Sequence, residues 1–141
     1  MNENTQAVVE EFLRRTAGDT PERIAELYAE TVDWRVSWPA PEHPDVPWIR
    51  PRSTRADVAD HYRTFARVCV PEAGEVRLDQ VIVDGADAVL FGASFQQVNP
   101  TGQRFAMTFA LRLTVHEGLI SRHHMYEDSL AVAAAFRARP A

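Results

Sequence analysis

Residues 103–128 constrain the fold of this chain more than any other stretch. Apolar side chains occupy every second position over residues 105–115, and smaller or polar side chains fill the positions between them. Because successive side chains leave a strand on opposite sides, this period of two predicts a β-strand with one buried face. Residues 116–118, His-Glu-Gly, then predict a tight turn that leads into a second strand over residues 119–128.

The second half of that returning strand is unusually rich in titratable groups for a strand that covers a core. Regular alternation places His123, Met125 and Glu127 on one face, and His124 and Tyr126 on the other. A long apolar strand beside such a strand is typical of a sheet that lines a pocket. We therefore expect the face that carries His123 to look into that pocket.

The composition excludes several classes of function. With 141 residues, 45% hydrophobic and 25% charged, the chain has the size and balance of one globular domain, residues 1–141. A formal net charge of -5 argues against nucleic acid or an anionic membrane as a partner. All basic residues are arginine, so Schiff-base chemistry and a phosphate-loop lysine are excluded.

The single cysteine, Cys69, rules out an internal disulfide and fits a reducing compartment. It ends an apolar helical run, so a buried inert thiol is favoured over a nucleophile. No apolar stretch reaches the length needed to span a bilayer. These features predict a soluble cytoplasmic protein.

The remaining pattern predicts an α+β layout. Helices are expected over residues 4–16, 54–68 and 130–137. A further helix is expected to begin at Thr20 and to bury a stripe of Ile24, Leu27 and Tyr28. Strands are expected over residues 32–38, 75–83 and 88–98, followed by the hairpin. Residues 39–52 hold five of the nine prolines and predict a rim loop anchored by Trp48. The expected architecture is a curved antiparallel sheet with helices on one face.

Two stretches resemble the nuclear-transport-factor-2-like (NTF2-like) superfamily. The run AGDTPERIAELYAETVDW resembles its helix–turn–helix–strand opening, and HEGLISRHHMYEDSL resembles its closing strand, which ends in an acid. The superfamily includes ketosteroid isomerases, SnoaL-like polyketide cyclases, limonene-type epoxide hydrolases and scytalone dehydratase. The resemblance implies a cone-shaped domain in which three N-terminal helices and the sheet enclose an apolar pocket, commonly in a homodimer. It is less informative about activity, because this scaffold hosts unrelated reactions.

The catalytic residues of these relatives are mostly absent from the matching positions. The position of the isomerase base falls near Val36, Ser37 or Trp38, none of which is an acid. The position of the isomerase tyrosine falls near Glu11 or Phe12. The aspartate that cyclases and epoxide hydrolases carry on the last strand corresponds to Met125. The dehydratase branch uses histidines, which this chain does carry.

The chain's own candidates for acid/base catalysis are His123, Glu127 and His61. A neutral imidazole is a versatile acid/base near pH 7, although a solvated or interface histidine is the alternative for His123. His123 and Glu127 lie about 13 Å apart along the strand, so they can flank a substrate without bonding each other. The adjacent pair His123-His124 suits a metal ion poorly, because neighbours on a strand point apart. The expected substrate-binding residues are Tyr28, Trp38, Trp48, Arg50, Tyr62, Phe109 and Met125.

Two kinds of function remain open at this point. The first is a cofactor-free cyclase, isomerase or dehydratase that acts on an apolar oxygenated small molecule such as a polyketide. The second is a binding or accessory protein that uses the same pocket without turnover, and the missing aspartates favour it. An epoxide hydrolase is a further enzyme alternative, in which Glu127 would supply the carboxylate. No nucleotide fingerprint or nucleophile-elbow motif is present.

Overall fold

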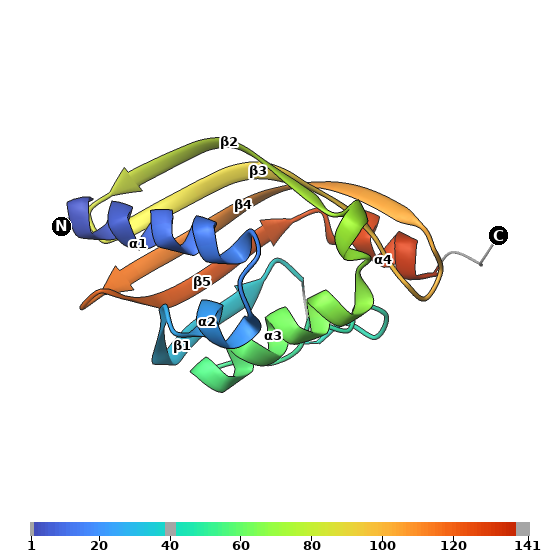
Figure 1. The fold of residues 1–141 in the computed structure, drawn as a ribbon, viewed down its shortest axis with the longest axis horizontal. Coiled ribbons are helices and arrows are strands. Elements are labelled where there is room, and N and C mark those ends of the chain that lie inside the picture. Colours follow the sequence, from blue (N-terminus) through green and yellow to red (C-terminus); the bar gives the residue numbers. More distant parts are fainter. Residues whose placement is uncertain (1, 39–41, 138–141) are drawn as a thin grey trace.

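The computed structural model describes residues 2–38 and 42–137. Four helices, one short 3₁₀-helix and five strands make up this part of the chain (Figure 1). In chain order they are α1 (Asn2–Thr16), α2 (Pro21–Ala25), β1 (Tyr28–Val36), α3 (Arg55–Val68), η1 (Pro71–Ala73), β2 (Glu75–Asp84), β3 (Asp87–Gln97), β4 (Arg104–His116), β5 (Leu119–Glu127) and α4 (Ser129–Arg137).

The strands form one sheet in the order β1-β5-β4-β3-β2. The last four strands are an antiparallel meander, as predicted, and β1 joins the end of the sheet parallel to β5. The two outer hairpin turns contain Gly85 and Gly118, which have φ of 62° and 78°. Such positive values are accessible to glycine without steric cost, so the local sequence favours these turns.

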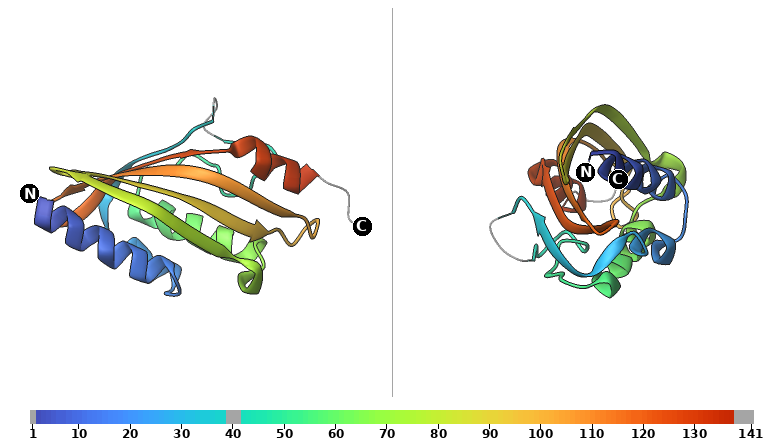
Figure 2. Two further views of the ribbon diagram at one scale, coloured as in Figure 1. Left: turned by 90° about the horizontal axis from the view of Figure 1, so that it is seen from above. Right: turned by 90° about the vertical axis from the view of Figure 1, so that its left-hand side faces the viewer.

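The helices cover one side of the curved sheet (Figures 1 and 2). Helix α1 contacts β2, β3 and β4, while α2 packs on α3 and α3 packs on β1. Helix α3 begins with a reciprocal capping box, in which Thr54 accepts from the Asp57 backbone and Asp57 accepts from the Thr54 backbone. The predicted α+β architecture is therefore confirmed.

The structure corrects the region between the second helix and the first strand. The second helix ends at Ala25, and Tyr28 opens β1 instead of extending a helical stripe. Tyr28 pairs with Ile120 of β5, and the Ile120 amide donates to the Leu27 carbonyl. This pairing with a distant strand overrides the local helical pattern, which is a common outcome for short helices.

The predicted rim loop is only partly visible, because residues 39–41 lie outside the described residues. Residues 42–53 form neither helix nor strand, as the prolines predict. Trp48 anchors this segment, since it is buried and its ring packs against Phe65 and Phe136.

Two hydrophobic clusters fill the space between the sheet and the elements that cover it. The first cluster lies under α1, α2 and the start of α3 and includes Leu111, Leu113 and Ile120. The second joins the rim segment, the end of α3 and α4 to Phe105 and Met107. On β4, the boundary between the two clusters therefore lies between Met107 and Phe109.

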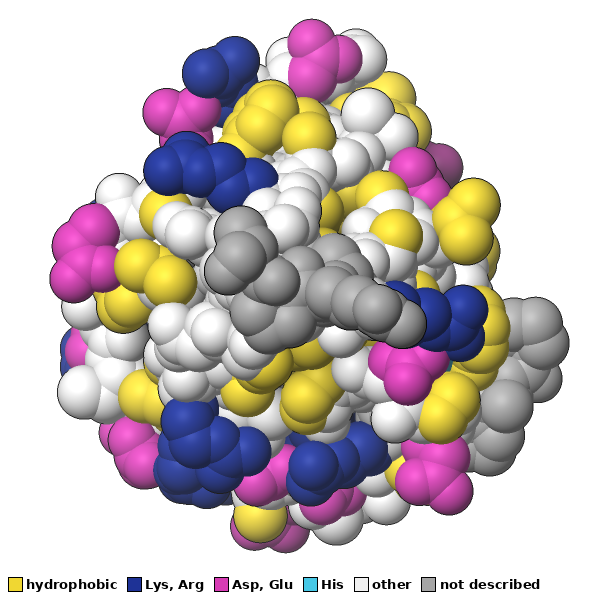
Figure 3. Space-filling model, turned by 90° about the vertical axis from the view of Figure 1, so that its right-hand side faces the viewer, with side chains coloured by type: hydrophobic (Ala, Val, Ile, Leu, Met, Phe, Trp, Pro, Cys, Tyr) yellow, Lys and Arg dark blue, Asp and Glu magenta, His cyan; other side chains and the backbone are white. Residues whose placement is uncertain are grey.

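No helix in the described part of the chain is both long and apolar enough to cross a membrane. At the end of the molecule where α4 lies, basic and acidic side chains are interspersed around the rim (Figure 3). This mixed surface agrees with the absence of any strongly basic stretch in the sequence.

Candidate functional site

Four residues form a continuous row across the sheet at the boundary between the two clusters. Leu78 of β2 pairs with Gly92 of β3, Gly92 pairs with Phe109 of β4, and Phe109 pairs with Glu127 of β5. Directly opposed residues of neighbouring strands share a face, so all four lie on the helix-covered side of the sheet. We call these four residues the central row.

Glu127 is the titratable member of the central row. Ser37 holds its main chain: the Glu127 amide donates to Ser37 Oγ at 3.0 Å, and Ser37 Oγ donates to the Glu127 carbonyl at 3.3 Å. The side-chain Oε2 is buried and accepts no hydrogen bond. Burial, followed by the nearby Asp128 charge, raises the pKa of Glu127 to about 7. This carboxyl group can therefore gain or lose a proton near neutral pH.

A second polar group lies further along the same face of β5. The Tyr28 hydroxyl lies 2.8 Å from His123 Nδ1 and 3.2 Å from the Tyr62 hydroxyl. The His123 ring stacks on Trp34, with centroids 3.8 Å apart and planes 4° apart. The His61 ring meets the same indole edge-on at 4.7 Å. These five side chains, which we call the aromatic network, come from β1, α3 and β5.

The titratable members of the aromatic network are uncharged at neutral pH. Burial, with smaller contributions from His61 and His124, holds the pKa of His123 well below 6.5. Burial, with a contribution from Arg52, lowers the pKa of His61 to about 3. Burial also raises the pKa values of both tyrosines above 10. The network therefore offers neutral hydrogen-bond donors and acceptors.

The structure brings His61 and Tyr62, neighbours on α3, to the site together. Tyr62 reaches Tyr28, and His61 reaches Trp34. Consecutive residues on a helix are only about 100° apart, so two neighbours can flank one inward stripe. His61 Nδ1 and Trp34 Nε1 are both buried and have no hydrogen-bond partner.

The other expected binding residues are distributed around the interior. Phe109 belongs to the central row, and Met125 packs against the first hydrophobic cluster. Trp38 stacks on His43 of the rim segment at 4.1 Å, so Trp34, and not Trp38, is the indole in contact with the histidines. Trp48 is buried in the second cluster, and Arg50 is exposed.

His123 and His124 do diverge, as their adjacency predicts. The Nε2 atom of His124 lies 3.0 Å from Asp33 Oδ2, on the opposite side of the sheet from the aromatic network. Within residues 2–38 and 42–137, no group of three or more His, Cys, Asp or Glu side chains is placed to hold a metal ion.

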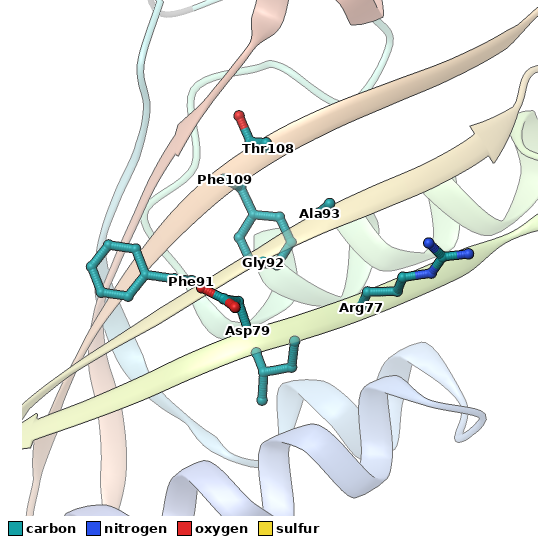
Figure 4. A pocket seen from close by; sticks show the side chains of 8 residues that line it. Arg77, Asp79, Phe91, Gly92, Ala93, Thr108 and Phe109 are labelled. Carbon is teal, nitrogen blue, oxygen red and sulfur yellow. The ribbon is translucent and has the colours of Figure 1, made fainter.

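A cleft of about 430 Å³ lies over β2, β3 and β4 around Gly92 (Figure 4). Leu78, Gly92 and Phe109 line it together with Arg77, Phe91, Ala93 and Thr108, which alternate with them along the strands. The side chains of these four neighbours face the outer side of the sheet, so the cleft opens away from Glu127. The register of β2 shifts between Leu78 and Gln80, which places the irregular Asp79 at the cleft. Figure 4 shows the Phe109 ring reaching from β4 across β3 at Gly92.

Sequence reasoning did not identify Leu78, Gly92 or Trp34 as site residues. An isolated glycine inside a strand pattern is a known sign of a bulge or a close approach, so Gly92 carried a usable signal. Trp34 carried none, because a tryptophan on an inward strand face is equally typical of an ordinary core.

A family model of the SnoaL-like domain matches residues 9–123. The chain belongs to the SnoaL-like family. No curated protein matches it. Solved structures similar to this SnoaL-like protein include an NTF2-like protein from Burkholderia xenovorans LB400, with 16% identity, a TM-score of 0.79, and coverage of 97% of this chain and 98% of that one.

Two further similar structures extend the comparison. An NTF2-like protein of unknown function from Burkholderia pseudomallei K96243 has 15% identity and a TM-score of 0.80 over 96% of this chain and 98% of that one. A protein from Catenulispora acidiphila DSM 44928, with a ketosteroid isomerase-like fold and in complex with trimethylamine, has 13% identity and a TM-score of 0.72 over 92% and 91%. At these identities the likeness establishes the fold, and the NTF2-like prediction is confirmed.

Proposed function

We propose that this SnoaL-like protein is a cofactor-free acid/base enzyme that moves a proton on an apolar, oxygenated small molecule. One observation carries the proposal: the buried, unpaired carboxyl oxygen of Glu127, on a side chain whose pKa is raised to about 7. A general base or acid is most effective when its pKa lies near the working pH. Perturbed carboxyl groups of this kind concentrate at functional sites.

Glu127 is the base in this mechanism. Its carboxylate takes a proton from a carbon atom activated by a conjugated carbonyl group. The electron pair of the broken C–H bond moves through the conjugated bonds to the carbonyl oxygen, which becomes an enolate. Return of the proton to another carbon gives an isomer, whereas attack of the enolate carbon on a second carbonyl carbon closes a ring.

The aromatic network stabilises the enolate in this scheme. With the proton on His123 Nδ1, the imidazole donates to the Tyr28 oxygen, and the Tyr28 hydroxyl donates to the Tyr62 oxygen. The Tyr62 hydroxyl is then free to donate to the substrate oxygen. Fixed neutral donors in a dry site favour an oxyanion strongly, because they need no reorganisation when charge develops. His123 acts through Tyr28, so we assign it a positioning role and His61 a supporting one.

The α-protons of 2-tetralone in D₂O offer a direct test, because their exchange for deuterium is followed by proton NMR without knowledge of the natural substrate. We expect the protein to accelerate the exchange and Glu127→Gln to reduce this acceleration at least 100-fold. Glu72→Gln, an exposed carboxyl in η1, is the matched control and should exchange at the original rate.

Retained acceleration in Glu127→Gln would refute the role of Glu127. Binding of the ketone without any acceleration by the original protein would instead favour a binding or accessory protein. Epoxide opening is the alternative that uses the same carboxylate, with water as the attacking group. Hydrolysis of an aryl epoxide, without exchange of 2-tetralone, would favour it.

A cytoplasmic homodimer is also part of the proposal. On the outer face of the sheet, Ile82 and Tyr126 are exposed large hydrophobic side chains, and the helices lie on the other face. Burial of this face against a second copy would remove apolar surface from water. Light scattering tests it: a dimer mass that Tyr126→Glu converts to a monomer mass supports the interface, and a monomer mass for the original protein refutes it.

A further inference from the structure

We propose that the indole N–H of Trp38 and the imidazole N–H of His43 form a hydrogen-bond donor site that binds a carbonyl oxygen of the substrate. We call these two residues the rim donor pair. This inference rests on the proposed function and adds a second carbonyl group to the substrate, because Tyr62 already holds one oxygen. The rim donor pair therefore makes the protein selective for dicarbonyl compounds over monocarbonyl compounds of the same skeleton.

The rim donor pair lies at the same end of the site as Glu127. Ser37, the residue before Trp38, shares two hydrogen bonds with the main chain of Glu127, at 3.0 and 3.3 Å. Trp38 packs against the second hydrophobic cluster, inside the molecule. Trp34, which pairs with His123, stands four residues earlier on the same segment. The aromatic network is therefore about 13 Å away along the strand direction.

Both members of the pair present an unpaired donor. The Asp45 amide donates to His43 Nδ1 at 3.0 Å, so Nδ1 carries no proton and the imidazole proton is on Nε2. His43 is 6% exposed, and its Nε2 atom has no hydrogen-bond partner. Trp38 Nε1, which can only donate, is also buried without a partner. Leaving buried donors unsatisfied is costly, so an oxygen that accepts from them stabilises the complex.

The surrounding contacts fix the position of His43 before any ligand binds. Its amide donates to the Ile49 carbonyl at 3.0 Å. Asp45 is held in turn by Arg137 at the end of α4, with Oδ2 and Nε 2.5 Å apart. The His43 and Trp38 rings lie 4.1 Å apart, with planes at 35°. Donors that are ordered in advance lose little entropy when a ligand binds.

The charges near the pair favour an uncharged acceptor. Arg52, the buried arginine of the rim segment, is engaged by Asp60 at 2.9 Å, and Arg50 is exposed to water. Neither guanidinium is therefore available to neutralise a buried anion. A carboxylate group at the pair would also be repelled by ionised Glu127. An uncharged carbonyl oxygen fits both conditions, because it accepts hydrogen bonds without bringing a charge.

A substrate that reaches both ends of the site carries two carbonyl oxygens. A separation of about 13 Å, less one hydrogen bond of about 2.9 Å at each end, leaves on the order of 7 Å between them. Glu127 takes the proton from a carbon atom conjugated with both carbonyl groups. The electron pair of the broken C–H bond is then shared by the two oxygens, each of which accepts from fixed neutral donors.

The indole proton of Trp38 reports on this contact in the protein without any substitution. The chain has three tryptophans, and the loss of one indole signal in Trp38→Phe identifies the Trp38 signal in a ¹H–¹⁵N spectrum. The probes are trans-decalin-2,6-dione and trans-2-decalone, which share one skeleton and carry two carbonyl groups and one. We expect the dione to move the Trp38 indole proton downfield, and the monoketone to move it less, because an N–H proton that gains an acceptor is deshielded.

Absence of dione binding would overturn the proposal, as would dione binding that moves only the signals of Trp34 and Trp48. Affinities from calorimetry give an independent test. We expect the original protein to prefer the dione about tenfold, and Trp38→Phe and His43→Phe each to reduce this preference to about threefold. Each of these variants keeps an aromatic ring and removes one N–H donor.

His116→Phe is the matched control, because His116 is exposed at the end of β4, and it should keep the full preference. Equal affinities of the original protein for the two probes, or a preference that Trp38→Phe and His43→Phe both retain, would overturn the donor site. If either variant does not fold, the other gives the result.

The two proposals fail in distinguishable ways. A retained preference for the dione in both variants, together with lost exchange in Glu127→Gln, would overturn the rim donor pair and leave the role of Glu127 intact. A reduced preference in the variants, together with unchanged exchange in Glu127→Gln, would support the rim donor pair and refute proton transfer by Glu127.

Discussion

The buried carboxyl of Glu127 makes the stability of this protein depend on pH in a way that a single substitution should abolish. Its pKa rises from an ordinary value of 4.5 to about 7 on folding. The folded state therefore binds more protons than the unfolded state between these two values. The free energy of unfolding must then fall as pH rises from about 4.5 through about 7. Above that range, the ionisation of Glu127 lowers the free energy of unfolding no further.

A difference of two to three pKa units corresponds to about 3 kcal/mol, at 1.36 kcal/mol per unit. Glutamine has nearly the same shape and carries no charge, so Glu127→Gln should lack this loss. We expect the variant to be more stable than the original protein by up to about 3 kcal/mol at pH 8 and to differ little from it at pH 4.5. For a chain of 141 residues, that difference raises the melting temperature by up to about 10 °C.

Urea denaturation of both proteins between pH 4.5 and pH 8.5, followed by circular dichroism, measures this difference. Glu72→Gln serves as the control for loss of an exposed carboxyl. A stability difference between Glu127→Gln and the original protein that does not change with pH would show that Glu127 titrates normally. A difference that grows towards low pH would reverse the sign of the argument and refute it.

Three other outcomes follow from the same structure. Tyr28→Phe leaves His123 Nδ1 and the Tyr62 hydroxyl without their shared partner, so it should cost about 1–3 kcal/mol in urea denaturation, and no loss would contradict the hydrogen-bonded chain. The His123 imidazole should remain neutral in a ¹⁵N NMR titration well below pH 6.5, whereas a midpoint near 6.5 would indicate a solvated ring. Cys69 is 3% exposed and its pKa is raised to about 12, so Ellman's reagent should modify it only after unfolding, and rapid modification of the folded protein would contradict its burial.

The period-two pattern of residues 105–115 was sufficient to predict β4 and the meander around it. The pattern is long and unambiguous, and glycines mark the turns on either side. The end of the second helix was predicted wrongly, because Tyr28 belongs to a strand whose partner, Ile120, lies far along the chain. Local periodicity contains no information about such a partner.

Alternation along the last strand was sufficient to predict that Glu127 faces inward. It was not sufficient to predict which groups surround the Glu127 side chain. The raised pKa depends on a boundary between two hydrophobic clusters whose members come from every part of the chain. The cleft depends likewise on the register that sets Gly92 between Leu78 and Phe109. Register is a property of the assembled sheet, so these features could be recognised only in the structure.

The pH dependence of 2-tetralone exchange links the proposed proton transfer to one carboxyl group. If Glu127 is the base, kcat/KM should rise tenfold per pH unit up to about 7 and then level off, and Glu127→Gln should eliminate this dependence. A profile that is flat from pH 5 to pH 9, or one that Glu127→Gln leaves unchanged, would show that Glu127 is not the base.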